Sequence, residues 1–394
     1  MSLIDRRLRR WQGNLGRALG AVNRSLAAAG RTLALALVAA CTTSSRPVPA
    51  DANPEVPEYL GDARRAPFAD EVIDTAPARI WTAQVGRGSV GLPAVGDRIA
   101  AVATADRWVY VLDTRTGRPF WRYRGDAPFG AGPSIGDGRV YVASEGREGR
   151  LTALQLRDGK RRWRVRVGDV AAPLVLHEGT VFGATQDGTA FAYAADDGEP
   201  RWTRIVGPTR SGPLVVGSRL AIVTLTDSLI VLDAGTGAVT SRAGLPTSTL
   251  APLALVDDST VAIASPAGAL LAVDLPGGRP RWHIPTGAPI FGAPAVWRDT
   301  VFALTNRCTL WAVPVADPTR ADTTAIGCVA VAGPTIVRDG VLIAAIGGEV
   351  IYFDRRSDRR VWTRKVQGEL RHPPVVRRRQ ILVAPASGAV VSFR

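Results

Sequence analysis

Short runs of apolar residues separated by polar turns recur along the chain from residue 79 to residue 394. Each run holds about five residues that favour strands, and the turns between them carry pairs such as Asp158-Gly159 and Thr236-Gly237. Runs of this length are typical of β-strands, and glycine after Asp or Thr favours the tight turn of a hairpin. About four such strands fit into every 40 residues, so the pattern predicts hairpins rather than helices.

Two residue types mark a repeat of about 40 residues. The first marker is tryptophan, at Trp81, Trp121, Trp163, Trp202, Trp282 and Trp362. Two tryptophan slots are empty, one at Ser241 and one in the Thr-rich stretch 322–324. The second marker is proline and has no gap: Pro93, Pro133, Pro173, Pro213, Pro252, Pro294, Pro334 and Pro374. A fixed period of this length indicates a repeat architecture of eight units.

Eight units of four short strands predict an all-β fold, an eight-bladed β-propeller of four-stranded antiparallel blades over residues 79–394. A solenoid would need polar capping repeats at both ends, and neither end of this region has one. The last unit stops one strand short at residues 390–393. We therefore expect the N-terminal Trp81 strand to complete the last blade and close the ring.

The segment Leu112-Asp-Thr-Arg-Thr-Gly-Arg-Pro-Phe-Trp121 and the hairpin at 232–237 resemble the pyrroloquinoline-quinone-type (PQQ-like) propeller repeat. That resemblance implies that the hairpin glycine and the tryptophan dock each blade on the next one. The segments 80–86 and 388–394, behind a lipidation signal, make the chain similar to the BamB family of the outer-membrane β-barrel assembly machinery. This similarity implies a scaffold that binds other proteins, without enzymatic activity.

The N-terminus is expected to be an export signal followed by a tether. Residues 1–40 are interpreted as a signal peptide with a long basic lead, since the apolar run 32–40 is too short to span a bilayer. The run ends in Val38-Ala39-Ala40-Cys41, which resembles a bacterial lipobox, so Cys41 is the expected lipidation site. An ordinary cleavage site beside a cysteine is the alternative. Residues 41–78 lack periodicity and are expected to be a disordered tether.

Net charge does not indicate nucleic-acid binding. The formal charge is +14, but the first 40 residues hold seven arginines against the single acid Asp5. For the arginine-rich stretch 355–379, a nucleic-acid reader would need interleaved aromatics or a known binding module, and an exported protein meets little nucleic acid. We interpret the stretch as a charged blade edge that prevents strand pairing, with an anionic lipid or an acidic protein surface as the alternative.

The sequence shows no group of residues suited to catalysis, metal binding or a cofactor. His177, His283 and His372 lie in different units and lack partners at metal-ligand spacing, so loop or surface positions are expected. The pairs at 196–197 and 257–258 are interpreted as aspartates that satisfy hairpin backbones. Quinoprotein dehydrogenases of the propeller family resemble one another in a calcium site and usually a vicinal cysteine pair, and this chain has no adjacent cysteines.

Cys308 and Cys328 are expected to form a disulfide. Reflected about a turn near Pro318, they fall opposite each other on two strands of one hairpin, in a unit that lost its tryptophan. An exported protein meets an oxidising compartment, which favours the bridge. Two unpaired buried thiols are the alternative.

The expected function is that of a lipid-anchored scaffold on the periplasmic face of the outer membrane, with proteins of the β-barrel assembly machinery as partners. Family members place partner contacts in long loops of the middle blades, but here the loops 207–212 and 245–250 are short. Arg210 is the long charged side chain in these two loops and the candidate partner-binding residue. A periplasmic sensing propeller and a PQQ-dependent dehydrogenase remain as alternatives.

Overall fold

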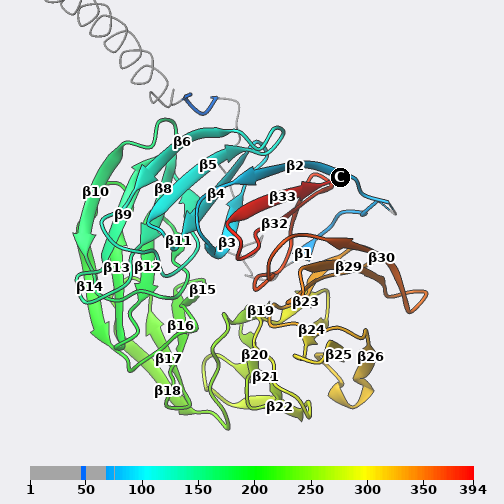
Figure 1. The fold of residues 1–394 in the computed structure, drawn as a ribbon. Coiled ribbons are helices and arrows are strands. Elements are labelled where there is room, and N and C mark those ends of the chain that lie inside the picture. The colour runs from blue at the N-terminus through cyan, green and yellow to red at the C-terminus, as the bar shows by residue number, and fades with distance from the viewer. Residues whose placement is uncertain (1–45, 50–67, 75) are drawn as a thin grey trace, which may run out of the picture. The chain divides into compact units, whose positions relative to one another are not determined.

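The computed structural model describes residues 46–49, 68–74 and 76–394 of the chain. The expected signal peptide and Cys41 lie outside these residues. In the described part, the strands form eight sheets arranged in a ring (Figure 1). The prediction of an all-β, eight-bladed propeller is therefore confirmed.

We number the blades in chain order. Blade 1 contains β3 (Ser89–Val95), β4 (Ile99–Thr104), β5 (Trp108–Asp113) and β6 (Pro119–Arg124). Blade 2 contains β7 (Ser134–Gly136), β8 (Arg139–Ala143), β9 (Arg150–Gln155) and β10 (Arg161–Arg166). Blade 3 contains β11 (Val175–His177), β12 (Thr180–Ala184), β13 (Thr189–Ala194) and β14 (Pro200–Ile205). Blade 4 contains β15 (Leu214–Val216), β16 (Arg219–Val223), β17 (Ser228–Asp233) and β18 (Val239–Gly244).

The second half of the ring follows the same order. Blade 5 contains β19 (Ala254–Asp257), β20 (Thr260–Ser265), β21 (Ala269–Asp274) and β22 (Pro280–Pro285). Blade 6 contains β23 (Ala295–Trp297), β24 (Thr300–Leu304), β25 (Thr309–Pro314), a 3-10 turn η1 (Pro318–Arg320) and β26 (Asp322–Ala325). Blade 7 contains β27 (Thr335–Val337), β28 (Gly340–Ala345), β29 (Glu349–Asp354) and β30 (Arg359–Lys365). Blade 8 contains β31 (Val375–Arg377), β32 (Gln380–Val383), β33 (Ala389–Phe393) and β2 (Arg79–Gln84).

Burial along the strands explains why the apolar runs were continuous. All six residues of β4, β20 and β28 are buried, because each middle strand is covered on both faces by neighbouring blades. A strand buried on both faces needs an unbroken apolar run rather than alternation. The outer strand β14 instead buries one residue, Trp202, and exposes the rest.

The ring closes through the two ends of the propeller sequence. Strand β2 pairs antiparallel with β33, with Trp81 opposite Ser392 and Gln84 opposite Ala389. The pairing continues past the strands, since the Ala78 and Arg394 main chains exchange hydrogen bonds of 2.7 and 2.9 Å. Closure removes the exposed edge that blade 8 would otherwise present. The predicted pairing of the Trp81 strand with residues 390–393 is confirmed.

The repeated tryptophans connect neighbouring blades. The Trp81 indole Nε1 donates to the carbonyl of Thr114 in the blade 1 hairpin at 2.8 Å, and the ring covers Gly117, where a Cβ would lie 2.6 Å from the indole. Gly117 has φ +69°, so the position needs glycine for both space and backbone conformation. The same donation links Trp121 to Leu156. It also links the following pairs: Trp163 to Ala195, Trp202 to Ala234 and Trp282 to Val315.

Part of the segment expected to be a disordered tether packs on the propeller. The short strand β1 (Phe68–Ala69) pairs parallel with β27, on the inner side of blade 7. Ile73 is 3% exposed in the core between blades 7 and 8. Further upstream, Val48 is buried against blade 1 and its amide donates to the carbonyl of Arg157. For these residues the expected disorder is wrong, and residues 68–74 and 76–78 are called the strap below.

No helix among the described residues has both the length and the apolar character needed to cross a membrane.

Candidate functional site

One end of the axial channel is built from loops of all eight blades. Strands alternate in direction within each blade, so the loops that lead from an outer strand to the next inner strand lie at one end, called the open end. They surround a cavity of about 230 Å³. Its lining comprises Gly91, Gly130–Gly132, Ala171, Pro173, Arg210, Leu250–Pro252, Phe291–Ala293, Val331–Gly333 and Arg371–Pro373.

Glycine lets these loops pack main chain against main chain. A Cβ on Gly132 would lie 2.3 Å from the carbonyl oxygen of Leu92, and one on Gly292 would lie 1.9 Å from the amide nitrogen of Gly333. Neither distance is compatible with a side chain. Main-chain atoms therefore form much of the cavity wall, and only a few larger side chains contribute to it.

Three polar side chains project from this wall: Arg210, Arg371 and His372. Arg371 forms an ion pair with Glu369 at 2.6 Å. Burial in the channel wall, together with the charge of Arg371, lowers the pKa of His372 to about 4. The imidazole is therefore neutral at physiological pH and offers one donor and one acceptor. No carboxylate is present among the described residues that line the cavity.

Exposed apolar side chains surround the same end. Leu250 and Phe291 line the cavity and are 41% and 39% exposed. Val329 lies in the loop between blades 6 and 7 and is 58% exposed, and Leu225 lies in the turn between β16 and β17. A cluster of exposed apolar residues next to polar ones is typical of a protein interaction site.

At the opposite end of the channel, the strap forms hydrogen bonds with blades 7 and 8. Asp70 accepts from Arg338 Nε at 2.9 Å, and this hydrogen bond lowers the pKa of Asp70. The Glu71 carboxylate accepts from the main-chain amides of Arg378 and Arg379. This end is therefore built partly from residues that precede the propeller.

The strap also replaces a hairpin that blade 8 lacks. Trp362 Nε1 donates to the carbonyl of Asp74 at 3.1 Å, where the other tryptophans use a hairpin of the next blade. The hairpin is missing because the outer two strands of blade 8 come from opposite ends of the chain. Arg364 Nε adds a bond of 2.9 Å to the carbonyl of Pro77.

The arginine-rich stretch 355–379 is more than a solvated edge. Its basic side chains form ion pairs with acidic residues elsewhere in the propeller, and the sequence of the stretch alone does not indicate these partners. The pairs are Arg356 with Asp339 at 2.9 Å, Lys365 with Glu349 at 3.3 Å and Arg377 with Asp97 at 2.9 Å. Arg356 and Lys365 stay largely exposed, so these ion pairs are compatible with the charged edge that the sequence predicts.

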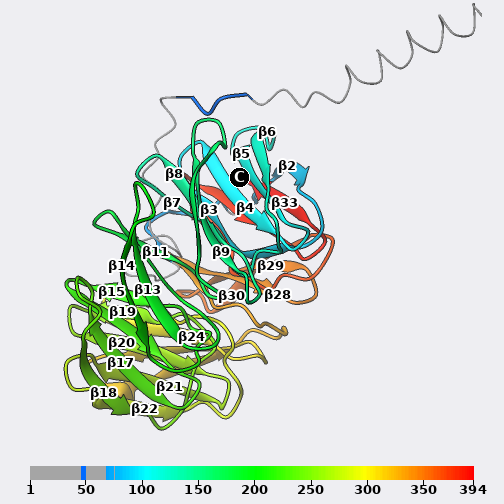
Figure 2. The ribbon, with the colours of Figure 1, turned by 90° about the vertical axis from the view of Figure 1, so that its left-hand side faces the viewer.

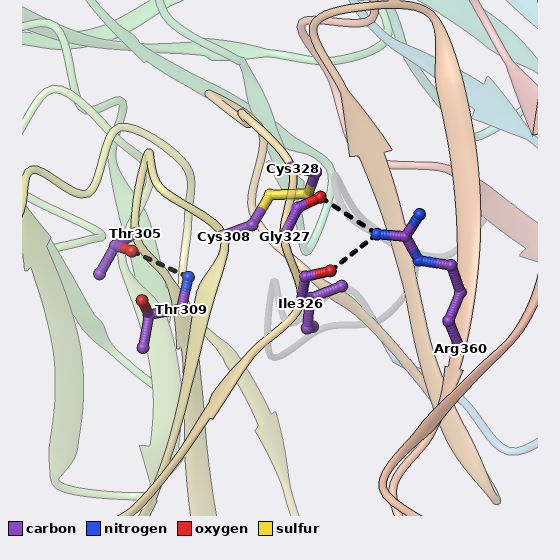
Figure 3. The surroundings of a disulfide bond; sticks show 7 residues. All are labelled: Thr305, Cys308, Thr309, Ile326, Gly327, Cys328 and Arg360. Atoms are coloured by element: carbon purple, nitrogen blue, oxygen red, sulfur yellow. Dashed lines mark hydrogen bonds between the residues drawn. A yellow bond between two sulfur atoms is a disulfide. The ribbon is translucent and has the colours of Figure 1, made fainter.

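Cys308 and Cys328 are joined in a disulfide with a Cα separation of 5.2 Å (Figure 3). Both lie beyond the strand ends, Cys308 in the turn before β25 and Cys328 in the loop after β26, rather than opposite each other on the strands. The amide of Ile326 donates to the Cys308 carbonyl at 3.0 Å beside the bridge. The disulfide thus ties the loop that carries Val329 to the body of blade 6.

The other polar candidates lie apart from the open end. His177 is at the end of the inner strand β11 and His283 is exposed on the outer strand β22. Asp197 accepts from the amide of Glu199, and Asp257 accepts from the amide of Ser259. These aspartates satisfy hairpin backbones. Among the described residues, no group of three or more His, Cys, Asp or Glu is arranged to hold a metal ion.

Sequence reasoning identified Arg210 but missed its neighbours at the open end. Their signal was the proline marker, because at least one of the residues two and three positions before each marker proline lines the cavity. Among these lining residues most are Gly, Ala or Val, and the exceptions are Arg210, Leu250, Phe291, Arg371 and His372.

The matches to known proteins cover the repeat region of the chain. The family model described as outer membrane protein assembly factor BamB matches residues 70–174, 147–320 and 309–394. A BamB from Burkholderia pseudomallei is 28% identical over 236 residues, which is 58% of this chain and 51% of that protein. The alignment thus spans about half the length of that relative.

Two solved structures share the fold. BamB from Moraxella catarrhalis has a TM-score of 0.67 at 16% identity, covering 81% of this chain and all of that one. Quinohemoprotein alcohol dehydrogenase from Comamonas testosteroni has a TM-score of 0.69 at 14% identity, covering 87% of this chain and 81% of that one. At these identities the similarity concerns the fold alone.

Proposed function

Because the chain belongs to the family of the outer membrane protein assembly factor BamB, we propose that it binds a protein of the machinery that assembles β-barrels in the outer membrane. It acts as a scaffold without catalysis, attached through a lipid on Cys41 to the periplasmic face of that membrane. The expected partner is a barrel-assembly protein.

One observation carries this proposal. The two ends of the channel are built differently: the strap occupies one end, while the other presents loops of all eight blades with exposed Leu225, Leu250 and Phe291 beside Arg210. Interfaces combine a few apolar anchors with arginine and a polar surround. We place the binding surface at the open end for this reason.

The donor set at the channel mouth does not fit the calcium and quinone pair of the dehydrogenases that share the fold. Calcium takes six to eight oxygen ligands, usually including carboxylates. The described residues lining this cavity offer two arginines and a histidine instead, and the chain has no vicinal cysteines. Binding is therefore the better supported activity, and cofactor reconstitution with a dye-linked oxidation assay is the test of the alternative.

The experiment compares two matched triple variants. Leu225→Ser, Leu250→Ser and Phe291→Ser together remove apolar side chains at the open end. Ile80→Ser, Val239→Ser and Val361→Ser remove equally exposed side chains at the outer strands. Each tagged protein is used to capture partners from detergent-solubilised membranes, and captured proteins are identified by mass spectrometry.

We expect the wild type and the outer-strand variant to capture a barrel-assembly protein and the open-end variant to lose it. Equal capture by both variants would move the binding surface elsewhere. Failure of the wild type to capture any barrel-assembly protein would contradict the scaffold function and favour a sensing propeller.

A further inference from the structure

Another cavity lies where blade 8 meets blade 1, and we call it the arginine pocket. It has a volume of about 400 Å³ and shares no lining residue with the cavity at the open end. Four of the described residues that line it are arginines and the other three are polar: Arg98, Arg115, Arg378 and Arg394, with Asp97, Thr114 and Gln380. Blades 8 and 1 are neighbours in the ring (Figure 1), so ring closure brings these residues together.

The carboxylate in the described lining is already bound by arginine. Asp97 accepts from Arg377 Nε at 2.9 Å and from the Arg378 guanidinium, and its side chain is 11% exposed. Two positive charges more than balance this one negative charge. Asp97 therefore does not neutralise the other arginines of the pocket.

Nearby acceptors are used as well. The Thr114 carbonyl accepts from Trp81 Nε1 at 2.8 Å and from Gln380 Nε2 at 2.5 Å, and a carbonyl oxygen has two lone pairs. Asp113, next to Thr114 in the chain, accepts from the Arg115 amide at 2.9 Å. The groups still able to form hydrogen bonds in the pocket are therefore mainly donors.

Two arginines of the pocket are available to a ligand. Arg115 and Arg394 are exposed, and neither has an ion-pair partner among the residues that the structure describes. Their main chains are nevertheless fixed, since Asp113 binds the Arg115 amide and Arg394 exchanges two main-chain hydrogen bonds with Ala78. Donors on a fixed main chain lose less conformational entropy when they bind an anion.

The composition of the pocket favours phosphate over other anions. A phosphate monoester carries a charge of about −1.5 to −2 at pH 7 and three acceptor oxygens, whereas a carboxylate has a single charge and two oxygens. Arginine binds phosphate through two parallel hydrogen bonds. The described lining contains no aromatic side chain on which a nucleotide base could stack.

The size of the pocket suits a small ester. A water molecule takes about 30 Å³ in the liquid, so a cavity of 400 Å³ has space for roughly a dozen of them. A phosphate group and a small alcohol such as glycerol fit into that space together.

From these observations we propose that the arginine pocket binds the phosphate group of a phosphomonoester of glycerol size. Arg115 and Arg394 bind the phosphate oxygens, and Arg98 and Arg378 add positive charge around them. A soluble glycerol phosphate and the headgroup of phosphatidic acid offer the same chemical group, and the two arms of the experiment distinguish them. The site is independent of the protein partner proposed for the open end.

The first arm titrates the full chain with glycerol phosphate and follows the phosphorus NMR signal of the ligand. We expect saturable binding to the wild type. Replacing Arg115 and Arg394 together by glutamine removes two charge-assisted contacts and should weaken binding at least about tenfold.

The matched control replaces Arg157 and Arg279 together by glutamine. Arg157 holds in the blade 2 hairpin the position that Arg115 holds in blade 1, and Arg279 lies in the blade 5 hairpin. Both are exposed and neither lines the pocket, so this pair removes the same total charge and should bind as the wild type does. Circular dichroism checks that every variant is folded.

The second arm measures sedimentation of the same proteins with phosphatidylcholine vesicles, with and without phosphatidic acid. A preference for phosphatidic acid that the Arg115 and Arg394 variant loses and the control keeps would assign the site to a lipid headgroup. Saturable binding of glycerol phosphate without that preference would assign it to a soluble ester.

Three outcomes would overturn the proposal. The first is that the wild type shows neither saturable binding of glycerol phosphate nor a preference for phosphatidic acid. The second is unchanged binding by the folded Arg115 and Arg394 variant. The third is equal weakening in the control, which would show a response to total charge rather than to the pocket.

Discussion

The two ends of the axial channel are made of the same repeat but differ in how their polar groups are used. At the strap end, Asp70 and Glu71 are bound by arginine side chains and main-chain amides of blades 7 and 8. At the open end, Arg210 is exposed and has no ion-pair partner among the residues that the structure describes. Figure 2 gives a second view of the blades, turned by 90°.

This difference separates residues that stabilise the fold from residues that are available to a ligand. A charge that is paired and packed contributes to the folded state, whereas an exposed and unpaired charge contributes almost nothing to it. Substitutions of buried groups such as Ile73 and His372 should therefore change stability, and those of exposed, unpaired groups at the open end such as Arg210 should change binding. The four predictions below test that division, from the largest expected change in stability to the smallest.

Ile73→Ala should lower the free energy of unfolding by about 3 to 4 kcal/mol, because it leaves a cavity between blades 7 and 8. The neighbouring Val72 is 38% exposed, so Val72→Ala should change it by less than about 0.5 kcal/mol. Urea denaturation of both variants measures the difference. Equal stability of the two would mean that the strap does not contribute to the fold.

Replacing Cys308 and Cys328 together by serine should cost about 2 to 3 kcal/mol, as expected for a bridge that closes a loop of 20 residues. The cross-link restricts the unfolded chain and holds the loop that carries Val329. Thiol labelling of the unfolded, unreduced wild type is the accompanying measurement. Two labelled thiols in a Cys41→Ser background would show that the bridge does not form.

His372 should make stability depend on pH. Its pKa is about 4 in the folded state against an ordinary value of 6.5, so the unfolded chain takes up a proton first as the pH falls. Between pH 7 and pH 5 this should cost the wild type at most about 2 kcal/mol. His372→Gln should remove that part of the loss in urea denaturation at the two pH values. An identical pH dependence in both proteins would show that the imidazole is solvated.

Arg210→Ala should leave stability within about 0.5 kcal/mol of the wild type and weaken partner capture about fivefold. Arg219 is the control, since it is exposed at the opposite end of the same blade, and Arg219→Ala should bind normally. Quantitative capture with calibrated amounts of each protein measures the effect. Equal weakening in both variants would point to total charge rather than to the open end.

Much of the fold could be predicted from the sequence, because the residues of each repeat specify their own strands and turns. Apolar runs specify strands, the Asp-x-x-Thr-Gly hairpins specify turns, and the spacing of tryptophan and proline counts the blades. Ring closure could also be predicted, because the last unit lacks one strand and the Trp81 strand precedes the first complete unit, so the two can pair in one blade. Arg210, chosen as a long charged side chain in a short loop, lines the open-end cavity, and its role in partner binding stays a prediction.

The strap and the positions of the cysteines were decided by the tertiary structure alone. Asp70 and Glu71 sit in a polar segment without periodicity, and their partners Arg338, Arg378 and Arg379 lie far along the chain. A local pattern can specify a strand and its turn, but contacts between distant segments exist only once the ring has formed.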